Sequence, residues 1–388
     1  MSSLQLHPDQ QAQLRTTLQL VAAQIEQAGG AIPFDRFMEL ALYAPGAGYY
    51  VNGSHKFGAE GDFITAPEVS PLFSQCLANQ CAQVLGQLGG GEVLEFGAGS
   101  GIMAADMLLR LQHLESLPER YLILELSAEL QQRQRQTIER AAPDLLPRVQ
   151  WIDSLPSSKW RGVVVANEVL DAMPVNIFRL NGSDWQELYV AMSGGRLVEQ
   201  WGEPGQVLSA ALEDLRTRVG ELQQGYRSEI NLRLQGWLQA LSGFIEKGAV
   251  ILVDYGYTGA EYYHPERSEG TLICHLQHRA HDDPLALPGL QDITANVDFS
   301  AVAHAGLDAG LELAGYTTQA HFLIANGLDG LMSGIDLADT ERHLQRVQEL
   351  KQLTLPTEMG ERFKVIGFER GLQQPLQGFQ ARDLRVYL

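Results

Sequence analysis

The sequence predicts an α/β fold in which a mostly parallel sheet is covered by helices on both faces. From Glu92 onward, short apolar segments alternate with amphipathic ones, a pattern typical of such a sheet. A glycine-rich turn, residues 97–101, comes directly after the first of these segments and directly before a predicted helix. Strand, turn and helix in this order indicate the start of a Rossmann-like core.

Residues 1–90 are expected to form an N-terminal helical annex that contributes to the active site. Its first helix has apolar residues at helical spacing and ends at residues 29–30, which are both glycine. Two further helices are predicted over residues 32–43 and 71–86, and the segment between them is rich in turn residues.

Residues 91–388 are expected to form the core, with an insertion at about residues 175–230 between the fourth and fifth strands. Seven core strands are predicted from short apolar runs: residues 93–96, 121–126, 149–151, 163–166, 249–254, 316–320 and 363–369. Four core helices are predicted between them: residues 102–111, 128–141, 232–247 and 299–313. Within the insertion, residues 175–180, 186–190 and 196–200 are separated by glycine turns and predict hairpins.

The chain of 388 residues carries 47 acidic and 28 basic side chains, a formal net charge of −19. This charge would repel a phosphate backbone, so no nucleic-acid substrate is expected, whereas a cationic protein would be attracted. Acidity that serves solubility alone explains the same charge. No apolar run approaches the roughly 20 residues of a membrane span, and the polar start lacks the features of a targeting segment. With only three cysteines, the composition favours a cytoplasmic protein.

The glycine-rich turn predicts a site for a small-molecule cofactor. Glycine permits positive φ and lets a ligand approach the backbone, and the following helix offers unpaired N–H groups. Residues 99–104 also satisfy the dinucleotide pattern, so the turn alone leaves a nicotinamide cofactor open. Glu95, two positions before Gly97, would repel a pyrophosphate but would hold the ammonium group of a methionine moiety. This carboxylate favours the sulfonium cofactor S-adenosyl-L-methionine.

Two further acids stand where predicted strands end. Glu125 is placed to accept hydrogen bonds from both ribose hydroxyls, as acids do in nucleotide-binding folds generally, so it does not separate the two cofactors. Asp153, just after the third strand, is placed to accept a hydrogen bond from the adenine amino group. An exposed turn aspartate before Ser154 is the alternative interpretation.

A second polar cluster, residues 166–174, follows the fourth strand. Because ligands gather beyond the carboxyl ends of parallel strands, Asn167, Glu168 and Asp171 are expected to face the same crevice as the glycine-rich turn. An amide both donates and accepts, and two carboxylates can hold a guanidinium or take up the proton that it loses on methylation. The alternative is a capped turn that leads into a short helix.

One segment of the sequence has side chains of the types that bind zinc. Cys274, His275, His278 and His281 lie close together in the sequence, and such side chains bind zinc in many proteins. Their spacing is unusual for a zinc motif, and histidines in a loop or partly buried explain them as well. No metal site is therefore expected.

Several motifs, in the expected order, resemble the MidA family and cover the chain from roughly residue 30 to its end. They are residues 61–68, 93–101, 167–174, 253–256, 270–272, 291–299 and 360–365. The resemblance implies a class I methyltransferase with S-adenosyl-L-methionine as cofactor. Its mitochondrial members are complex I assembly factors that methylate an arginine of a subunit. One departure is Asn296, where the family commonly has histidine, and this puts proton transfer at that position in doubt.

Position by position, the resemblance implies that Glu95, Gly97 and Gly99 hold the methionine end of the cofactor and that Glu125 holds its ribose. It also implies that residues 61–63 lie near the cofactor and the active site. The residues expected to bind the cofactor are Gly61, Phe63, Glu95, Phe96, Gly97, Ala98, Gly99, Gly101, Glu125, Leu126, Asp153 and Asn167. The expected catalytic residues are Glu168 and Asp171, supplemented by Asp62, Asp292 and Asp298, which ordinary turn or cap aspartates would explain equally well.

The chain is therefore expected to be a methyltransferase that modifies an arginine side chain of a protein, such as a respiratory-complex subunit or another cationic protein, with a homodimer as one form to test. Because the sulfonium methyl group is already activated, the enzyme needs mainly to align the two reactants, exclude water and accept a proton. Its rivals are a small-molecule methyltransferase, a nicotinamide-linked oxidoreductase, and a non-catalytic assembly or chaperone-like protein that keeps the fold.

Overall fold

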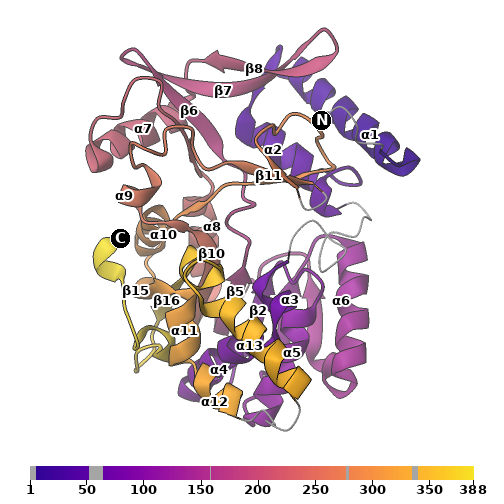
Figure 1. The fold of residues 1–388 in the computed structure, drawn as a ribbon, viewed down its shortest axis with the longest axis vertical. Helices are drawn as coiled ribbons and strands as arrows, with labels where there is room; N and C mark the ends of the chain where they lie inside the picture. Colours follow the sequence, from indigo (N-terminus) through magenta and orange to yellow (C-terminus); the bar gives the residue numbers. More distant parts are fainter. Residues whose placement is uncertain (1–5, 52–63, 158, 277–278, 334–339) are drawn as a thin grey trace. The chain divides into compact units, whose positions relative to one another are not determined.

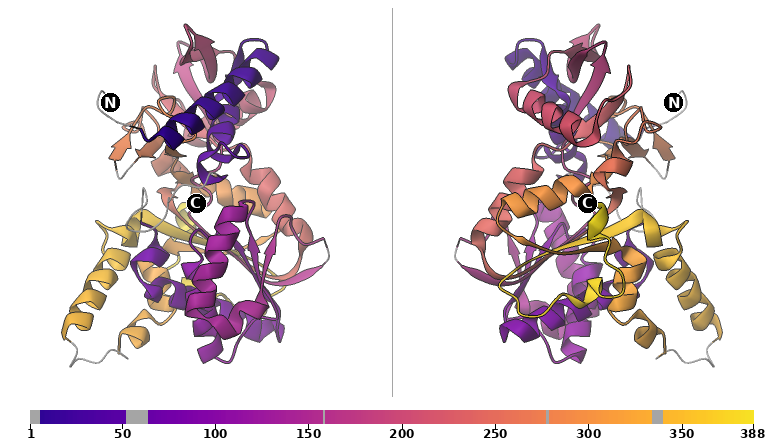
Figure 2. Two further views of the ribbon diagram at one scale, coloured as in Figure 1. Left: turned by 90° about the vertical axis from the view of Figure 1, so that its right-hand side faces the viewer. Right: turned by 90° about the vertical axis from the view of Figure 1, so that its left-hand side faces the viewer.

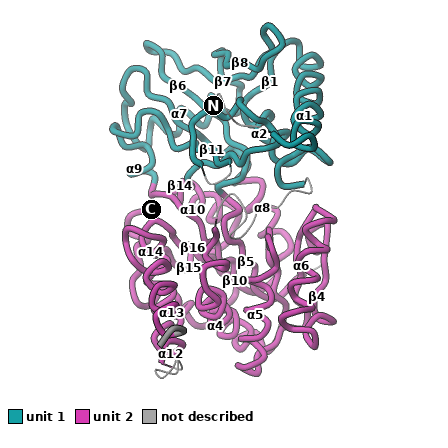
Figure 3. The backbone as a smooth tube through the Cα atoms, turned by 45° about the vertical axis from the view of Figure 1, so that its right-hand side comes forward, with its two compact units in different colours: residues 1–56, 171–234, 259–296 teal, residues 57–170, 235–258, 297–388 magenta. Residues whose placement is uncertain are grey.

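The structure, a computed structural model, describes residues 6–51, 64–157, 159–276, 279–333 and 340–388 (Figure 1). The chain divides into two compact units, each assembled from three separate stretches of sequence (Figure 3). Unit 1 comprises Met1–Lys56, Asp171–Leu234 and Gly259–Asn296, and unit 2 comprises Phe57–Leu170, Gln235–Thr258 and Val297–Leu388.

Unit 2 is built on the predicted sheet, and all seven predicted strands are present in it. They are β2 (Glu92–Phe96), β3 (Tyr121–Leu124), β4 (Val149–Ile152), β5 (Trp160–Asn167), β10 (Ile245–Tyr257), β15 (Glu312–Thr318) and β16 (Phe363–Arg370). Their order across the sheet is β15-β16-β10-β5-β2-β3-β4. All neighbouring pairs from β10 to β4 are parallel, whereas β16 is antiparallel to both β10 and β15. The order reverses between β2 and β5, and sheets of this kind bind ligands beyond the carboxyl ends of the strands at such a point.

Helices cover both faces of this sheet (Figure 2). One face packs in a single apolar cluster with α4 (Pro71–Leu88), α5 (Ile102–His113) and α6 (Ala128–Ala141). On the other face lie α8 (Leu234–Phe244), through edge-to-face contacts of Trp237 with Phe96 and of Phe244 with Trp160, and α10 (Phe299–Asp308). Burial of apolar surface on both faces holds the three layers together.

The remaining elements of unit 2 are short or lie at its C-terminal side. They are α3 (Ala66–Val69), β14 (Val297–Asp298), α11 (Gln319–Ala325), α12 (Leu328–Ser333), α13 (Thr340–Thr354), α14 (Met359–Arg362) and the 3₁₀ turns Pro143–Arg148, Gln377–Phe379 and Arg385–Tyr387. Across the described parts of the whole chain, no helix combines the length and the apolarity needed to cross a bilayer.

Several predicted boundaries differ from the structure by a few residues, and three of them are wrong for a clear local reason. The helix predicted over residues 299–313 ends at Asp308, because Gly310 adopts a φ of +78° and the chain enters β15. The helix predicted over residues 232–247 ends at Phe244, where β10 begins. The strand predicted over residues 316–320 ends at Thr318, whose side chain accepts the N–H of His321 and so caps α11.

Unit 1 is built around an antiparallel sheet that contains the predicted hairpins. Its strands are β1 (Ala31–Pro33), β6 (Asn176–Asn181), β7 (Asp184–Ser193), β8 (Arg196–Gly202) and β9 (Arg227–Ile230), in the order β1-β7-β6-β9 with β8 paired to β7. A second sheet has the order β12-β11-β13, formed by β11 (Ile273–Leu276), β12 (Arg279–His281) and β13 (Asp292–Thr294). The helical elements are α1 (Pro8–Gln27), α2 (Phe34–Tyr43), α7 (Gln206–Val219), α9 (Gly259–Tyr262) and the 3₁₀ turn Tyr49–Val51.

This division differs from the predicted one of an annex at residues 1–90 and a core at residues 91–388. The chain start joins the insertion because β1 pairs with β7, whereas α4 belongs to unit 2, where it packs on the large sheet. Residues 259–296 join unit 1, where the buried carboxylate of Glu229 accepts the N–H groups of Thr271 and Leu272 at 3.0–3.3 Å. Burial raises the pKa of Glu229 despite these bonds.

Two helical glycines of unit 2 offer a matched test of the packing. A Cβ at Gly306 in α10 would lie 2.2 Å from Phe368 Cε1, whereas a Cβ at Gly236 in α8 would have no atom within 4 Å. We expect Gly306→Ala to destabilise the protein by about 1–3 kcal/mol through overpacking. Gly236→Ala should stabilise it by up to about 1 kcal/mol through helix propensity. Urea unfolding followed by circular dichroism measures both, and equal effects of the two changes would contradict the described packing of α10.

Candidate functional site

The glycine-rich turn joins β2 to α5 and has the backbone that its composition predicts. Gly97, Gly99 and Gly101 all lie in the left-handed region, with φ values of +63°, +52° and +85°. A Cβ at Gly101 would lie 2.8 Å from Cα of Gln134, so α6 approaches the turn at this position. The turn therefore requires glycine for its conformation and, at Gly101, for space as well.

Glu95 lies directly before this turn and is fully buried. Its Oε2 accepts a hydrogen bond from the Tyr121 hydroxyl at 2.7 Å. Burial raises the pKa of Glu95 to about 7, an effect that the hydrogen bond from Tyr121 opposes and the charge of Glu125 reinforces. Among the described residues, no donor lies within hydrogen-bonding distance of Oε1. A buried carboxylate with an unused oxygen suits a ligand that brings a positive charge.

Glu125 lies just beyond the end of β3, as predicted, and α6 orients its side chain. Its Oε1 accepts the N–H of Ser127 at 2.9 Å, and its Oε2 accepts a hydrogen bond from Gln134 Nε2 at 3.0 Å. The same Gln134 nitrogen donates to Gly99 O at 3.2 Å, and Gln134 Oε1 accepts from Trp151 at 2.8 Å. Gln134 thus ties the glycine-rich turn to the acid on the neighbouring strand.

The other predicted cofactor residues occupy varied surroundings. Ala98 and Phe96 are buried, and Phe96 contacts Trp237. Leu126 is 69% exposed beside Glu125. Asp153 is exposed just after β4 and accepts a hydrogen bond from Ser154 Oγ at 3.1 Å. The cofactor roles of these residues stay predictions, and Gly61, Asp62 and Phe63 lie outside the described residues.

Asn167 and Glu168 lie where β5 ends. Asn167 is 9% exposed, and its Nδ2 donates to Glu168 Oε1 at 3.1 Å. In the part of the chain that the structure describes, Asn167 Oδ1 has no hydrogen-bond donor. Glu168 has a φ of +53°, a conformation that costs a non-glycine residue free energy and that concentrates at functional sites. This edge of the sheet therefore offers both an unused amide oxygen and a strained turn.

Asp171 and Asp292, which the sequence analysis assigns to catalysis, belong to unit 1. The unit boundary falls between Leu170 and Asp171, so the predicted pair of Glu168 and Asp171 is divided between the units. Asp171 and Asp292 are buried, and Asp292 Oδ1 accepts a hydrogen bond from the Tyr50 hydroxyl at 2.8 Å. The ring of Tyr43 stacks on that of Tyr50, with the ring centroids 5.5 Å apart.

Two further residues of the predicted site have structural partners. Asp298 caps α10, because its Oδ1 accepts the N–H groups of Ser300 and Ala301 at 3.0 and 3.1 Å. Asn296, the departure from the family pattern, donates its backbone N–H to Thr271 Oγ1 at 3.0 Å. The cap is one of the two interpretations that the sequence left open for Asp298.

The cysteine and histidine segment lies in the small sheet of unit 1. Cys274 and His275 belong to β11, and His281 on β12 is the register partner of Cys274. Within the described residues, no group of three or more histidine, cysteine or acidic side chains is arranged to hold a metal ion. His278 lies outside those residues.

Comparisons with known proteins show the family to which the chain belongs. Residues 76–317 match the model of the family described as "Putative S-adenosyl-L-methionine-dependent methyltransferase". The chain belongs to this family. The methyltransferase is also similar, at 42% identity, a TM-score of 0.95 and 100% coverage of both chains, to a crystal structure of a Burkholderia thailandensis protein bound to S-adenosyl-homocysteine.

Curated relatives resemble the methyltransferase over nearly its whole length. A Drosophila melanogaster protein named protein arginine methyltransferase NDUFAF7 homolog, mitochondrial, is 29% identical over 385 residues, which cover 90% of this chain and 85% of that protein. The Danio rerio protein arginine methyltransferase NDUFAF7, mitochondrial, is 28% identical over 365 residues, which cover 87% and 83%. The cofactor of this methyltransferase is S-adenosyl-L-methionine, and the unused oxygen of Glu95 and the left-handed glycines fit its charge and its need for a close backbone approach.

Gly101→Ala should weaken the binding of S-adenosyl-homocysteine about tenfold or more. The new Cβ must displace α6 or the turn, which causes strain of about 1–3 kcal/mol. A tenfold loss of affinity corresponds to a binding free energy of about 1.4 kcal/mol, which lies within that range. Gly194→Ala is the matched control, because Gly194 is also left-handed, with a φ of +57°, but has open space around its Cβ position at a hairpin turn. Isothermal titration calorimetry measures both affinities. Equal affinities for the two variants would exclude Gly101 from the cofactor site.

Binding of S-adenosyl-homocysteine should release protons near neutral pH. With its pKa raised to about 7, Glu95 is partly protonated in the free protein, and the ammonium group of the ligand would favour the carboxylate. Affinity should therefore fall as the pH drops below about 7. Calorimetry at one pH in buffers of different ionisation enthalpy counts the protons released. Glu95→Gln should bind weakly and release none, whereas proton release equal to that of the wild type would contradict this role.

The same pKa predicts how stability depends on pH. Since the folded-state pKa of Glu95 lies above its ordinary value of 4.5, this group's contribution is fully present below pH 4.5 and is lost as the pH rises through about 7. Without ligand, Glu95→Gln should consequently raise the melting temperature at pH 8 more than at pH 5. Thermal unfolding at both pH values checks the sign, and a larger gain at pH 5 would show that the burial of Glu95 is misjudged.

Proposed function

We propose that this methyltransferase transfers the methyl group of S-adenosyl-L-methionine to an arginine side chain of a protein partner. The observation that carries the proposal is the length over which the chain resembles curated relatives named protein arginine methyltransferases, 87–90% of its residues. The side chains of both units support it, because carboxylates and amides suit a guanidinium acceptor.

In unit 2, the end of β5 supplies the groups that such an acceptor needs. The cofactor supplies an activated methyl group, so the protein's own task is to orient the nucleophile and to stabilise charge. Asn167 Oδ1 is placed to accept an N–H of the guanidinium, and Glu168, whose Oε1 already accepts from Asn167, offers a carboxylate beside it. A guanidinium stays protonated near neutrality, so a carboxylate both attracts it and accepts the proton released on methylation.

In unit 1, four side chains form what we name the tyrosine–aspartate cluster: Tyr43, Tyr50, Asp171 and Asp292. The Tyr43 hydroxyl donates to Ala172 O at 2.9 Å, next to Asp171, and the Tyr50 hydroxyl donates to Asp292. Burial raises the pKa of both phenols, and the charges of Asp171 and Asp292 raise them further, so both phenols stay neutral donors. Stacked aromatic rings beside carboxylates are surroundings that favour cations.

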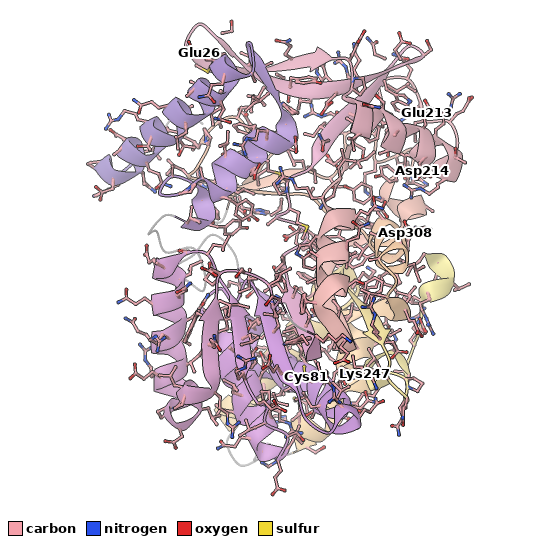
Figure 4. All side chains as sticks on the ribbon, turned by 180° about the vertical axis from the view of Figure 1, so that it is seen from behind. Glu26, Cys81, Glu213, Asp214, Lys247 and Asp308 are labelled. Carbon is pink, nitrogen blue, oxygen red and sulfur yellow. The ribbon has the colours of Figure 1, made fainter. Side chains whose placement is uncertain are left out.

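The charge of the chain supports a cationic protein segment as the partner. The formal net charge is −19, and acidic side chains such as Glu213 and Asp214 on α7 are exposed (Figure 4). A basic segment of a respiratory-complex subunit or of another protein would be attracted to such a surface. We also propose a cytoplasmic location, supported by three free, buried cysteines, and the homodimer stays a prediction.

The decisive experiment is methyl transfer from tritiated S-adenosyl-L-methionine to total protein from a strain that lacks the gene. We expect labelled protein that mass spectrometry assigns to methylarginine, and Glu168→Ala should lower the initial rate about a hundredfold or more. Label in a metabolite but not in arginine peptides would indicate a small-molecule methyltransferase. No label with the wild type, and full function of Glu168→Ala in cells, would indicate a non-catalytic protein.

The tyrosine–aspartate cluster yields a separate prediction. Asp292→Asn should lower the rate of transfer to a limiting amount of acceptor about tenfold to a hundredfold, since a charge-assisted hydrogen bond is worth about 1.5–3 kcal/mol. The affinity for S-adenosyl-homocysteine should stay within about twofold. Asp184→Asn, an exposed aspartate at the β6–β7 turn of the same unit, is the control and should keep the wild-type rate. An unchanged rate in Asp292→Asn would remove the cluster from acceptor binding.

A further inference from the structure

Two consecutive residues of β10 contact the turn that follows β5. Glu168 donates its backbone N–H to Val253 O at 2.9 Å, and Leu170 donates its backbone N–H to Asp254 Oδ2 at 2.9 Å. The second oxygen of Asp254, Oδ1, accepts the N–H of Tyr255 at 2.9 Å, and the Asp254 side chain is fully buried. The carboxylate therefore bridges the backbone of β10 and the backbone of the turn after β5.

This turn is one that backbone sterics disfavour. Glu168 and Glu115 are the non-glycine residues with positive φ among those described, and Glu168 has a φ of +53°. Such a conformation persists only where the surroundings impose it. The two hydrogen bonds to β10 hold the turn at Glu168 itself and at Leu170, two positions later.

A carboxylate suits this position better than an amide of the same shape. Asp254 presents one acceptor oxygen to each of two N–H groups, whereas asparagine has a single acceptor and would direct its amino group at the other N–H. Hydrogen bonds from backbone N–H groups to an ionised acceptor are also stronger than neutral ones. An asparagine here would leave one buried N–H without an acceptor.

We infer that Asp254 is a positioning residue for methyl transfer: its carboxylate fixes the left-handed turn at Glu168 and so aims the side chains of Asn167 and Glu168. The inference rests on the proposed function, in which these two side chains orient the acceptor. Asp254 lies on β10, whereas Glu95 and Glu125 belong to β2 and to the end of β3, beyond β5 in the sheet. Of the residues expected to bind the cofactor, Asn167 adjoins this turn, whereas Glu95 and Glu125 do not. Loss of the Asp254 carboxylate should therefore impair transfer far more than cofactor binding.

The test is Asp254→Asn, compared with the matched control Asp308→Asn, an exposed aspartate at the end of α10 that Figure 4 labels. In Asp254→Asn, hydrogen exchange read by mass spectrometry should show loss of protection at the Leu170 amide. Calorimetry should show an affinity for S-adenosyl-homocysteine within about twofold of the wild type. The initial rate of tritiated methyl transfer to total protein from the deletion strain should fall about tenfold to a hundredfold. The control should match the wild type in all three measurements.

Several results would overturn the inference. A wild-type rate in Asp254→Asn would do so, as would a parallel loss of ligand affinity and rate, which indicates a general structural role. Exchange in the wild-type protein provides a check that does not require the variant to fold: a Leu170 amide as unprotected as an exposed turn would mean that the bond to Asp254 is absent. Failure of the proposed function would look different from failure of this inference. The wild-type protein would then transfer no label to arginine, while the exchange and calorimetry results would be unaffected.

Discussion

The burial of one ionisable side chain is the constraint on which the organisation of unit 2 depends. β2 lies in the interior of the sheet, between β3 and β5, so the carboxyl group of Glu95 has no access to solvent. A buried carboxyl group is costly unless it is paired or protonated, and the Tyr121 hydroxyl satisfies only one of its oxygens. The left-handed glycines that follow leave three of the five positions of the adjacent turn without a side chain. A cofactor that carries both an ammonium and a sulfonium charge offsets this cost where a pyrophosphate would increase it.

Much of the sheet could be predicted because its strands are short and apolar and are separated by amphipathic helices. Apolar runs in the sequence therefore alternate with segments whose apolar residues have helical spacing. The interleaving of the two units could not be predicted in this way. β1 is a three-residue strand, Ala-Ile-Pro, without a pattern of its own, and its partner β7 lies far away in the sequence. Glu229 looks like an ordinary surface acid, and only the folded chain shows that it anchors residues 271 and 272. Pairing over long sequence distances is set by tertiary packing and leaves little trace in local composition.

In the candidate site, too, the residues that could be predicted are those with a local sequence pattern, and the residues that depend on tertiary contacts could not be predicted. Glu95, Glu125 and Asn167 could be placed because they lie at or just beyond the carboxyl ends of strands, and those ends of parallel strands meet at one edge. Gln134 and Tyr121 could not, since they act through hydrogen bonds between an amphipathic helix, a strand and the turn. Of the two tyrosines in the tyrosine–aspartate cluster, Tyr43 ends a helix that was predicted, whereas Tyr50 comes from a turn-rich segment that offered no pattern. The unit boundary between Leu170 and Asp171 also left no trace in the sequence, so Glu168 and Asp171, three positions apart, could not be assigned to different units.

The interleaved chain has a consequence for how the protein is made. The ribosome releases β1 long before it releases β7, so the first strand of unit 1 must remain without its antiparallel partner while most of the large sheet's parallel strands are being synthesised. β16, which completes the large sheet, is the last strand to appear. A premature stop codon before residue 296 would thus leave both units incomplete, and a later one would leave unit 2 incomplete. Neither unit can be excised as a continuous fragment. Until those later stretches have been synthesised, the nascent chain carries unpaired strand edges, which are prone to pair with other chains.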